Sequence, residues 1–233
     1  MIFLDRTDAG IKLAEKVAAT LAPGGTNTPT IVGLPRGGVP VALEVARRLS
    51  CPLELIEAKK LPYPGQPEFA IGAVSADGIV VLNHEIPGLE KMTALQSARW
   101  HDYIEQQRKQ LLEKTKNAEA QLYQRAGRSK ASLKGKIVVI VDDGIATGMT
   151  ALAAIETAIK QGATRVIMAA PVMSKESYEE LKSHCDTIIA LSRPDNFRAV
   201  GLYYQDFSQT SDEEVVQALR ESTGFASASS QAL

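Results

Sequence analysis

Two adjacent carboxylates, Asp142 and Asp143, are the side chains whose type and spacing point most clearly to chemistry. They follow an unbroken β-branched run at 138–141 and precede a segment rich in glycine and threonine at 144–150. Glycines let backbone amides approach a ligand closely, and amides at a helix start suit a phosphate. Because a phosphate would repel the acids, they need another partner. They fit the vicinal hydroxyls of a sugar or a divalent cation.

The elements around these acids must place them at the edge of a sheet. Residues 138–141 are typical of a strand buried on both faces of a parallel sheet. The run ALAAIETAIKQG that follows Thr150 is typical of a helix. Ligands of open α/β sheets bind beyond the carboxyl ends of the strands, where a turn leads into a helix. The alternative is an ordinary buried strand followed by a glycine turn.

A second strand–turn–helix unit carries an arginine at its turn. Residues 30–34 read as a short strand that runs into Arg36, Gly37 and Gly38 and then into a helix. A guanidinium beside free amides at a helix start would bind a highly charged anion such as diphosphate. The alternative is a tight turn with a solvent-exposed arginine.

A third segment predicts a mobile excursion between strands. Residues 53–59 read as a strand that ends at Lys59 and Lys60, and the stretch KLPYPGQPE carries three prolines and a glycine. The sequence ADG between AIGAV and IVVLN then marks a tight hairpin. Lys59 or Lys60 would neutralise diphosphate and Glu68 would position a nucleophile; the alternatives are a solvated strand end and a surface carboxylate.

The order of the remaining elements predicts an α/β protein with a doubly wound, mainly parallel sheet flanked by helices. Strands at 165–170 and 186–191 alternate with a helix at 174–184. Residues 91–127 read as one long helix or a broken pair, which packs one face as a dimer element or as an outer helix. Residues 1–222 are expected to form a single domain and 223–233 a flexible tail.

Composition limits the classes of function. The chain has 233 residues, 45% hydrophobic and 23% charged, with a net charge of −1. This balance offers no bulk basic surface for nucleic acid or membrane. No signal-peptide core and no bilayer-spanning apolar run is present. The two cysteines, Cys51 and Cys185, lack metal-ligand spacing and are interpreted as reduced thiols of a cytoplasmic protein.

The run VVIVDDGIATGMT resembles the phosphoribosyl diphosphate (PRPP) site of the type I phosphoribosyltransferases. The phrases DRTDAG, GLPRGGVPVA and KLPYPGQPEFAIGA occur in the same chain. Together they resemble an uncharacterised branch of bacterial phosphoribosyltransferase-domain proteins over most of the sequence. The resemblance implies the type I phosphoribosyltransferase fold, with a β-hairpin flexible loop that closes over the substrate and excludes water. It also implies a small hood formed by about 194–222 and the N-terminal segment.

The resemblance also implies roles for individual residues. The two acids hold the ribose hydroxyls and a magnesium ion, the latter directly or through water and PRPP. The loop of Arg36, Gly37 and Gly38 binds the leaving diphosphate. The 5′-phosphate is held by Gly144, Ile145, Ala146, Thr147, Gly148, Met149 and Thr150. The expected catalytic residues are Arg36, Lys60 and Glu68, and the expected acceptor-binding residues of the hood are Phe197, Tyr203 and Tyr204, with anchoring of the C-terminus as the alternative role.

One departure from the family concerns the acceptor. The hypoxanthine–guanine branch has an acid where this chain has Ala146, which argues against transfer to 6-oxopurines. Adenine-type enzymes also carry alanine there. The expected function is displacement of diphosphate from magnesium-bound PRPP by a nitrogenous acceptor that the sequence does not identify. The alternative is a non-catalytic PRPP- or nucleotide-binding regulator. The expected partners are PRPP and the acceptor, without nucleic acid or membrane, and a second copy if the long helix forms a homodimer.

Overall fold

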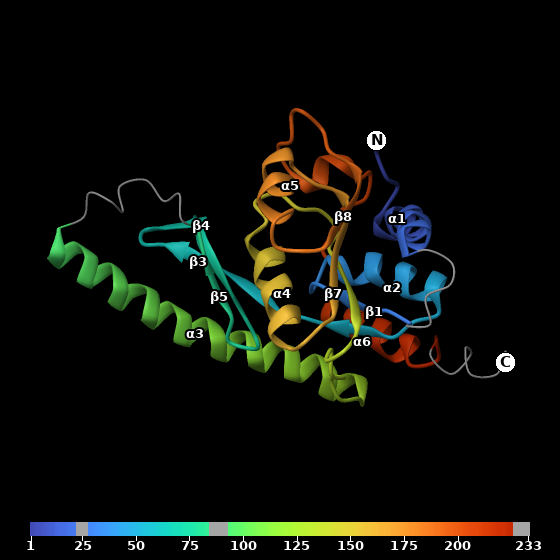
Figure 1. Ribbon diagram of the computed structural model, residues 1–233, viewed down its shortest axis with the longest axis horizontal. Helices are drawn as coiled ribbons and strands as arrows, with labels where there is room; N and C mark the ends of the chain where they lie inside the picture. The colour runs from blue at the N-terminus through green and yellow to red at the C-terminus, as the bar shows by residue number, and fades with distance from the viewer. Residues whose placement is uncertain (22–27, 84–92, 226–233) are drawn as a thin grey trace.

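The computed structural model describes residues 1–21, 28–83 and 93–225, without the side chains of 67, 68, 94 and 95. Within these residues the main sheet has five parallel strands in the order β2-β1-β6-β7-β8 (Figure 1). They are β1 (Thr30–Gly33), β2 (Leu53–Leu55), β6 (Ile137–Val141), β7 (Arg165–Val172) and β8 (Thr187–Ser192). The predicted parallel α/β sheet is confirmed.

The strand order reverses between β1 and β6. From β1 the chain moves outward to β2, and from β6 it moves the other way through β7 to β8. The two central strands are paired in register, with Gly33 beside Val141. Their carboxyl ends therefore lie at the same level, and both predicted anion loops begin there. Such a reversal is where doubly wound sheets bind ligands.

Helices cover both faces of this sheet. The first face carries α1 (Arg6–Leu21), α2 (Gly38–Leu49) and α6 (Asp212–Ser222), and the second carries α4 (Met149–Lys160) and α5 (Lys175–Leu181). Val139 and Val141 pack into the first core, whereas Val138 and Ile140 pack into the second. Burial on both faces explains why this strand has no polar residue. In the part of the chain described, no helix has the length and apolarity to cross a membrane.

A second sheet of three antiparallel strands contains β3 (Ala58–Tyr63), β4 (Gln66–Ser75) and β5 (Val80–Leu82). The prediction of one strand over 53–59 is wrong, because this segment divides between β2 of the main sheet and β3 of the second. KLPYPGQPE is not an excursion either, since it forms the ends of β3 and β4 around a turn at Gly65. The hairpin predicted at ADG is confirmed, with Gly78 at a φ of 83°.

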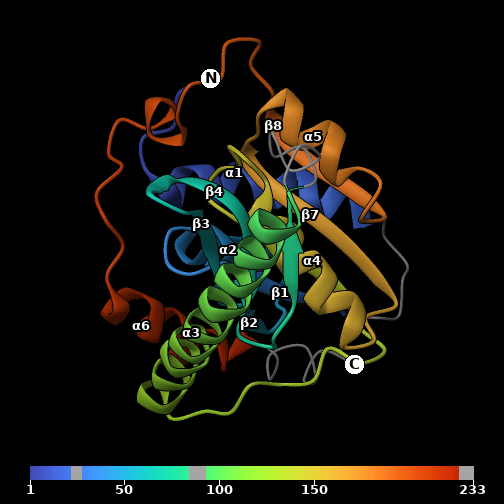
Figure 2. The same ribbon diagram turned by 90° about the vertical axis from the view of Figure 1, so that its left-hand side faces the viewer.

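The long helix α3 (Ala94–Ala126) is continuous over 33 residues. Its first half packs on the second sheet around Leu61, Ile71 and Ile104. Its last turns reach the main domain, where Tyr123 joins the first core. Figures 1 and 2 show α3 running along the second sheet towards α6. The helix therefore braces one sheet against the other.

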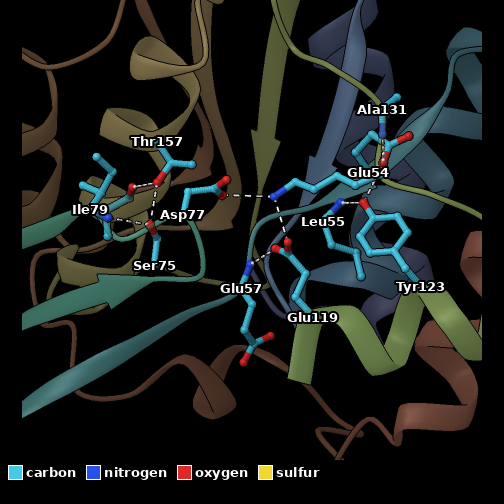
Figure 3. A network of polar contacts seen from close by, with 12 residues as sticks. Glu54, Leu55, Glu57, Ser75, Asp77, Ile79, Glu119, Tyr123, Ala131 and Thr157 are labelled. Carbon is cyan, nitrogen blue, oxygen red and sulfur yellow. Dashed lines mark hydrogen bonds and ion pairs between the residues drawn. The ribbon is translucent and has the colours of Figure 1, made fainter. Parts of the chain in front are cut away.

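A polar network fixes the point where the chain leaves the main sheet for the second one (Figure 3). Tyr123 Oη accepts a hydrogen bond from Leu55 N at 2.9 Å, and Glu119 Oε2 accepts one from Glu57 N at 3.0 Å. Lys130 Nζ also donates to Glu119, at 2.9 Å. Side chains of α3 thus satisfy backbone amides at the end of β2. The Glu57 side chain points away from this network.

The segment after β8 returns to the N-terminus. Phe3 N donates to Tyr203 O at 2.8 Å, and Gln205 N donates to Phe3 O at 2.8 Å. The Phe3 ring lies 5.4 Å from that of Tyr204. At the other end, Phe225 packs against the first core, so folded residues continue past 222. Residues 226–233 of the expected tail lie outside the described residues.

Candidate active site

The loop after β1 and the loop after β6 are hydrogen-bonded at their bases and touch at a glycine. Leu34 N donates to Val141 O at 3.0 Å, and Gly38 N donates to Leu34 O at 3.0 Å. A Cβ at Gly38 would lie 2.7 Å from Val141 O and 2.8 Å from Asp142 Cα. Only glycine permits this approach of two backbones. The Pro35–Arg36 peptide bond in the first loop is cis.

Gly37 brings the arginine loop against the second acid, since a Cβ there would lie 2.1 Å from Asp143 Oδ2. The same oxygen lies 2.8 Å from Arg6 Nε, and the two side chains are only 13% and 12% exposed. Arg6 Nη1 also donates to Ser208 O at 2.6 Å, and its guanidinium lies 4.0 Å from the Phe207 ring centre. Arg6 therefore ties the returning C-terminal segment to the acidic pair.

Burial raises the pKa of both acids. For Asp142 burial is the largest cause and the neighbouring Asp143 adds to it, so the pKa lies well above the ordinary value. For Asp143 burial also raises the pKa, and the Arg6 guanidinium opposes the rise. Carboxylates in such surroundings favour a ligand that brings hydrogen-bond donors or positive charge.

Hydrogen bonds anchor the loop between β6 and α4. Ile145 N donates to Val172 O at 2.9 Å, and Ser174 N donates to Ile145 O at 2.9 Å. Ser174 Oγ donates to Ala146 O at 2.9 Å. The Ile145 side chain is buried as well. The Ile145 amide is thus engaged within the protein, and the capacity of this loop to bind a ligand rests on the residues after it.

The start of α4 has the form of an anion site. The helix begins at Met149, after Gly148 with a φ of 71° and without a side-chain cap. The first hydrogen bond of the helical ladder runs from Leu152 N to Gly148 O at 2.7 Å. The preceding amides lie at the positive end of the helix dipole. Thr147 is exposed and Thr150 half-buried beside them, which gives this turn the donors that a phosphate needs.

Arg36 lines a cavity of about 480 Å³. The other charged side chains of its described lining are Glu57, Lys59, Arg125 and Asp212. Arg36 Nη1 lies 3.4 Å from Asp212 Oδ1, and Lys59 Nζ lies 3.6 Å from Glu57 Oε1. This anion pocket, as we call it below, therefore combines three cations with two carboxylates.

The two lysines of β3 lie on opposite faces, because successive side chains of a strand alternate. Lys59 lines the anion pocket with Arg36, whereas Lys60 is exposed and does not line it. Glu68 belongs to β4, and its side chain lies outside the described part of the structure. Of the three expected catalytic residues, only Arg36 is placed at this pocket by the described side chains.

The three aromatic residues expected in the acceptor site have different placements. Tyr204 is only 6% exposed, and its Oη donates to Asp143 O at 2.5 Å. Phe197 and Tyr203 are half-buried and stack at 5.6 Å with an interplanar angle of 20°. The alternative role of anchoring fits Tyr204, which supports the acidic pair from behind. The stacked pair presents a partly accessible aromatic surface.

Four residues at the site were not identified from the sequence: Arg6, Glu57, Arg125 and Asp212. Arg6 lies in the phrase DRTDAG, which carried the family resemblance but had no assigned role. Burial raises the pKa of Glu57 to about 7; Lys59 lowers it and Glu119 raises it. No local pattern distinguishes Arg6, Arg125 and Asp212, because their partners are distant in the sequence.

A larger hollow of about 1120 Å³ lies between β5, α4 and α5. Its lining includes none of the acids or loop glycines at the ends of β1 and β6. The volume of a cavity therefore does not identify the candidate active site in this protein, since a phosphate site is formed by amides and charges at a helix start.

The sequence matches a family model described as phosphoribosyl transferase domain over residues 4–207. Two proteins of Mycobacterium tuberculosis named "Putative phosphoribosyl transferase", MT0597 of strain CDC 1551 / Oshkosh and Rv0571c of strain ATCC 25618 / H37Rv, are each 43% identical over 218 residues. These matches cover 94% of this chain and 46% of each relative, so the chain spans about half their length.

A solved structure is similar over nearly the whole chain. The crystal structure of TT1426 from Thermus thermophilus has a TM-score of 0.76 and 41% identity, covering 95% of this chain and 99% of that one. The fold is that of doubly wound α/β proteins, with two helix-start loops meeting at the reversal of strand order. The chain belongs to the phosphoribosyl transferase domain family. Both the suspected family and the type I phosphoribosyltransferase fold are thereby confirmed.

Proposed function

We propose that this chain transfers the phosphoribosyl group of magnesium-bound PRPP to a nitrogenous acceptor and releases diphosphate. The main support is that a single reversal point carries both the acidic pair and the arginine loop, in contact through Gly37 and Gly38. PRPP carries a sugar, a 5′-phosphate and a diphosphate. Each of these groups has a matching set of protein groups within this one edge of the sheet.

Different residues would bind the different groups of PRPP. Asp142 and Asp143 accept hydrogen bonds from the ribose hydroxyls, and the amides at the start of α4 hold the 5′-phosphate. Fixing the ribose at both ends orients its anomeric carbon towards the acceptor. Arg36, with the amides of its loop, takes up the negative charge that grows on the diphosphate oxygen as the bond breaks.

The reaction exchanges one bond at the anomeric carbon for another. The acceptor nitrogen forms the new bond while the diphosphate leaves with the electron pair of the old one, through a cation-like sugar. Magnesium, held with PRPP by Asp142 and Asp143, would neutralise part of the diphosphate charge. Two adjacent carboxylates whose surroundings favour positive charge fit that ion.

The acceptor would approach from the side of the returning C-terminal segment. The stacked rings of Phe197 and Tyr203 offer a flat surface suited to a planar nitrogenous ring. Ala146 is exposed at the mouth of the phosphate loop and supplies no acid for proton transfer. This supports an acceptor other than a 6-oxopurine.

The test is calorimetry of PRPP with magnesium on the wild type and the double variant Asp142→Asn, Asp143→Asn. We expect the affinity to fall at least about tenfold, or about 1.4 kcal/mol, because the ribose and ion contacts weaken together. The fold should survive, because asparagine keeps the size while removing two charges that are costly to bury. The melting temperature checks this point.

Asp195→Asn is the control for this type of substitution, since its side chain is 84% exposed, although it removes one charge where the double variant removes two. Its PRPP affinity should equal that of the wild type. Unchanged affinity in the double variant would show that the acids do not face the ligand.

A further inference from the structure

One carboxylate of helix α6 lies between two guanidinium groups. Asp212 Oδ1 is 3.4 Å from Arg36 Nη1, and Asp212 Oδ2 is 3.9 Å from Arg125 Nη1. All three side chains line the anion pocket. The carboxylate thus uses one oxygen for the diphosphate loop and the other for helix α3. An anionic group seated between two arginines shows that the pocket can bring both guanidinium groups to one ligand.

Arg125 is held in place by contacts other than Asp212. Its guanidinium also pairs with Glu213, and its backbone oxygen accepts a hydrogen bond from Arg220 Nη2 at 2.6 Å. The end of α3 is therefore docked on α6, and Arg125 does not depend on Asp212 alone for its position. It is still 42% exposed, so its guanidinium is accessible to a solute in the pocket.

The remaining cation of the pocket is paired in the same manner. Lys59 is engaged by Glu57, as Arg36 is by Asp212. The Arg36–Asp212 pair is 41% and 51% exposed, so it is weak and exchangeable, whereas Glu57 is buried. A phosphate or diphosphate carries more charge than a carboxylate and forms charge-assisted bonds to more than one guanidinium at once. Such an anion should therefore displace Asp212.

We propose that Arg125 is a second guanidinium of the diphosphate site and that Asp212 is a built-in competitor, which occupies Arg36 and Arg125 until a diphosphate displaces it. This rests on the proposed function and adds a residue from α3 and one from α6 to it. Displacement frees the first turn of α6 from the arginine loop. The C-terminal helix is thereby linked to the filling of the site.

The experiment measures binding of inorganic diphosphate with magnesium to the full chain by calorimetry at fixed ionic strength. Arg125→Gln should weaken binding about tenfold, the size of a lost charge-assisted bond. Asp212→Asn should tighten it about two- to fivefold, the size of an exposed ion pair that no longer competes.

Two controls match these variants in charge and place. Arg47→Gln removes an arginine of α2 that is 43% exposed and paired with Glu221 of α6, yet lies outside the pocket. Glu221→Gln removes a carboxylate of the same helix as Asp212, α6, which pairs with Arg47 and does not line the pocket. Both should change the diphosphate Kd by less than about twofold. In the double variant Arg125→Gln, Asp212→Asn the gain from the second change should shrink, because the two residues are coupled.

The outcomes separate this proposal from the function on which it rests. If the wild type binds diphosphate through Arg36 while Arg125→Gln behaves like Arg47→Gln, or Asp212→Asn does not tighten binding, the inference is wrong and the proposed function stands. If the wild type binds neither diphosphate nor PRPP, the proposed function itself fails. Melting temperatures report folding, and Asp212→Asn, which keeps size and shape, serves as the decisive variant if Arg125→Gln does not fold.

Discussion

Charge at this site is controlled by residues from distant parts of the sequence. Asp143 meets its cation, Arg6, across 137 positions, and Arg36 meets Asp212 across 176. A buried acid next to another acid would favour its protonated form. Arg6 opposes that tendency at Asp143, so the N-terminal helix helps to keep an acceptor for hydroxyl groups ionised.

Removing Arg6 should therefore cost stability through the acid that it leaves behind. We expect Arg6→Gln to lower the free energy of unfolding by about 1–3 kcal/mol, because Asp143 loses its hydrogen-bonded partner in a largely buried place. Urea unfolding measures the change. Adding Asp143→Asn should recover part of the loss, since the uncompensated charge is then gone. An unchanged urea midpoint in Arg6→Gln would mean that solvent already screens this pair.

The free energy of unfolding should depend on pH through Glu57. Its pKa of about 7 in the folded chain exceeds the ordinary 4.5, so between these values the folded state holds a proton that the unfolded state has released. Stability from this group is full below pH 4.5 and declines as the pH rises through 7. Glu57→Gln should therefore gain about 1–3 kcal/mol relative to the wild type above pH 7 and nothing below 4.5.

Urea unfolding at three pH values measures this difference directly. Glu179→Gln, with a carboxylate that is 61% exposed, is the matched control and should follow the wild type throughout. A constant offset between Glu57→Gln and the wild type across the range would show that Glu57 titrates normally.

At the scale of elements, the helices and strands that could be predicted from the sequence are those that are evenly buried along their length. The strand at 138–141 was predictable because its residues alternate between two apolar cores. The break between β2 and β3 at 56–57 was not predictable, because residues 53–59 could belong to either sheet. The contacts that separate the two strands come from Tyr123 and Glu119 of α3. The prolines suggested a loop, yet β3 is an edge strand of the second sheet, and edge strands and bulges are the places in a sheet that tolerate proline; the β3–β4 register shifts on both sides of Pro62.

The same limit applies to the site. Its two loops were predictable because each is a local strand–glycine–helix pattern. Which of Lys59 and Lys60 faces the pocket was not predictable. It depends on which side chains of β3 face each way, and the predicted strand boundary was in the wrong place. Arg125 and Asp212 lie at the end and the start of helices that carry no sign of the pocket between them.

The second sheet and the first half of α3 should behave as a separate cooperative unit. Leu61 is fully buried in their shared cluster, so Leu61→Ala should cost about 2–5 kcal/mol locally. Native-state hydrogen exchange should then show faster exchange in β3 to β5 and in α3, with β1 and β6 still protected.

Leu53→Ala, which empties an equally buried position in the main sheet, should instead reduce protection at β1 and β6. Equal loss of protection everywhere in both variants would mean that the two sheets unfold together.

At the scale of the whole molecule, the described part of the chain brings the two segments expected to bind PRPP, 36–38 and 142–150, to one edge of one sheet. A binding protein and an enzyme would share the acidic pair and the phosphate loop. They differ in whether charge on the leaving diphosphate is stabilised as it develops. The chain spans about half the length of its curated relatives.

The variant Arg36→Ala distinguishes an enzyme from a non-catalytic PRPP-binding regulator. In an enzyme it should reduce turnover more than ground-state PRPP binding, because the leaving-group charge that Arg36 meets grows in the transition state. Diphosphate release is followed with PRPP, magnesium and a panel of bases, amines and phosphate, with Arg47→Gln as the charge-matched control. A non-catalytic regulator would bind PRPP with the same dependence on Asp142 and Asp143 yet release no diphosphate with any acceptor. Slow release without an acceptor would still favour the enzyme, since water can attack the activated sugar when the true acceptor is missing.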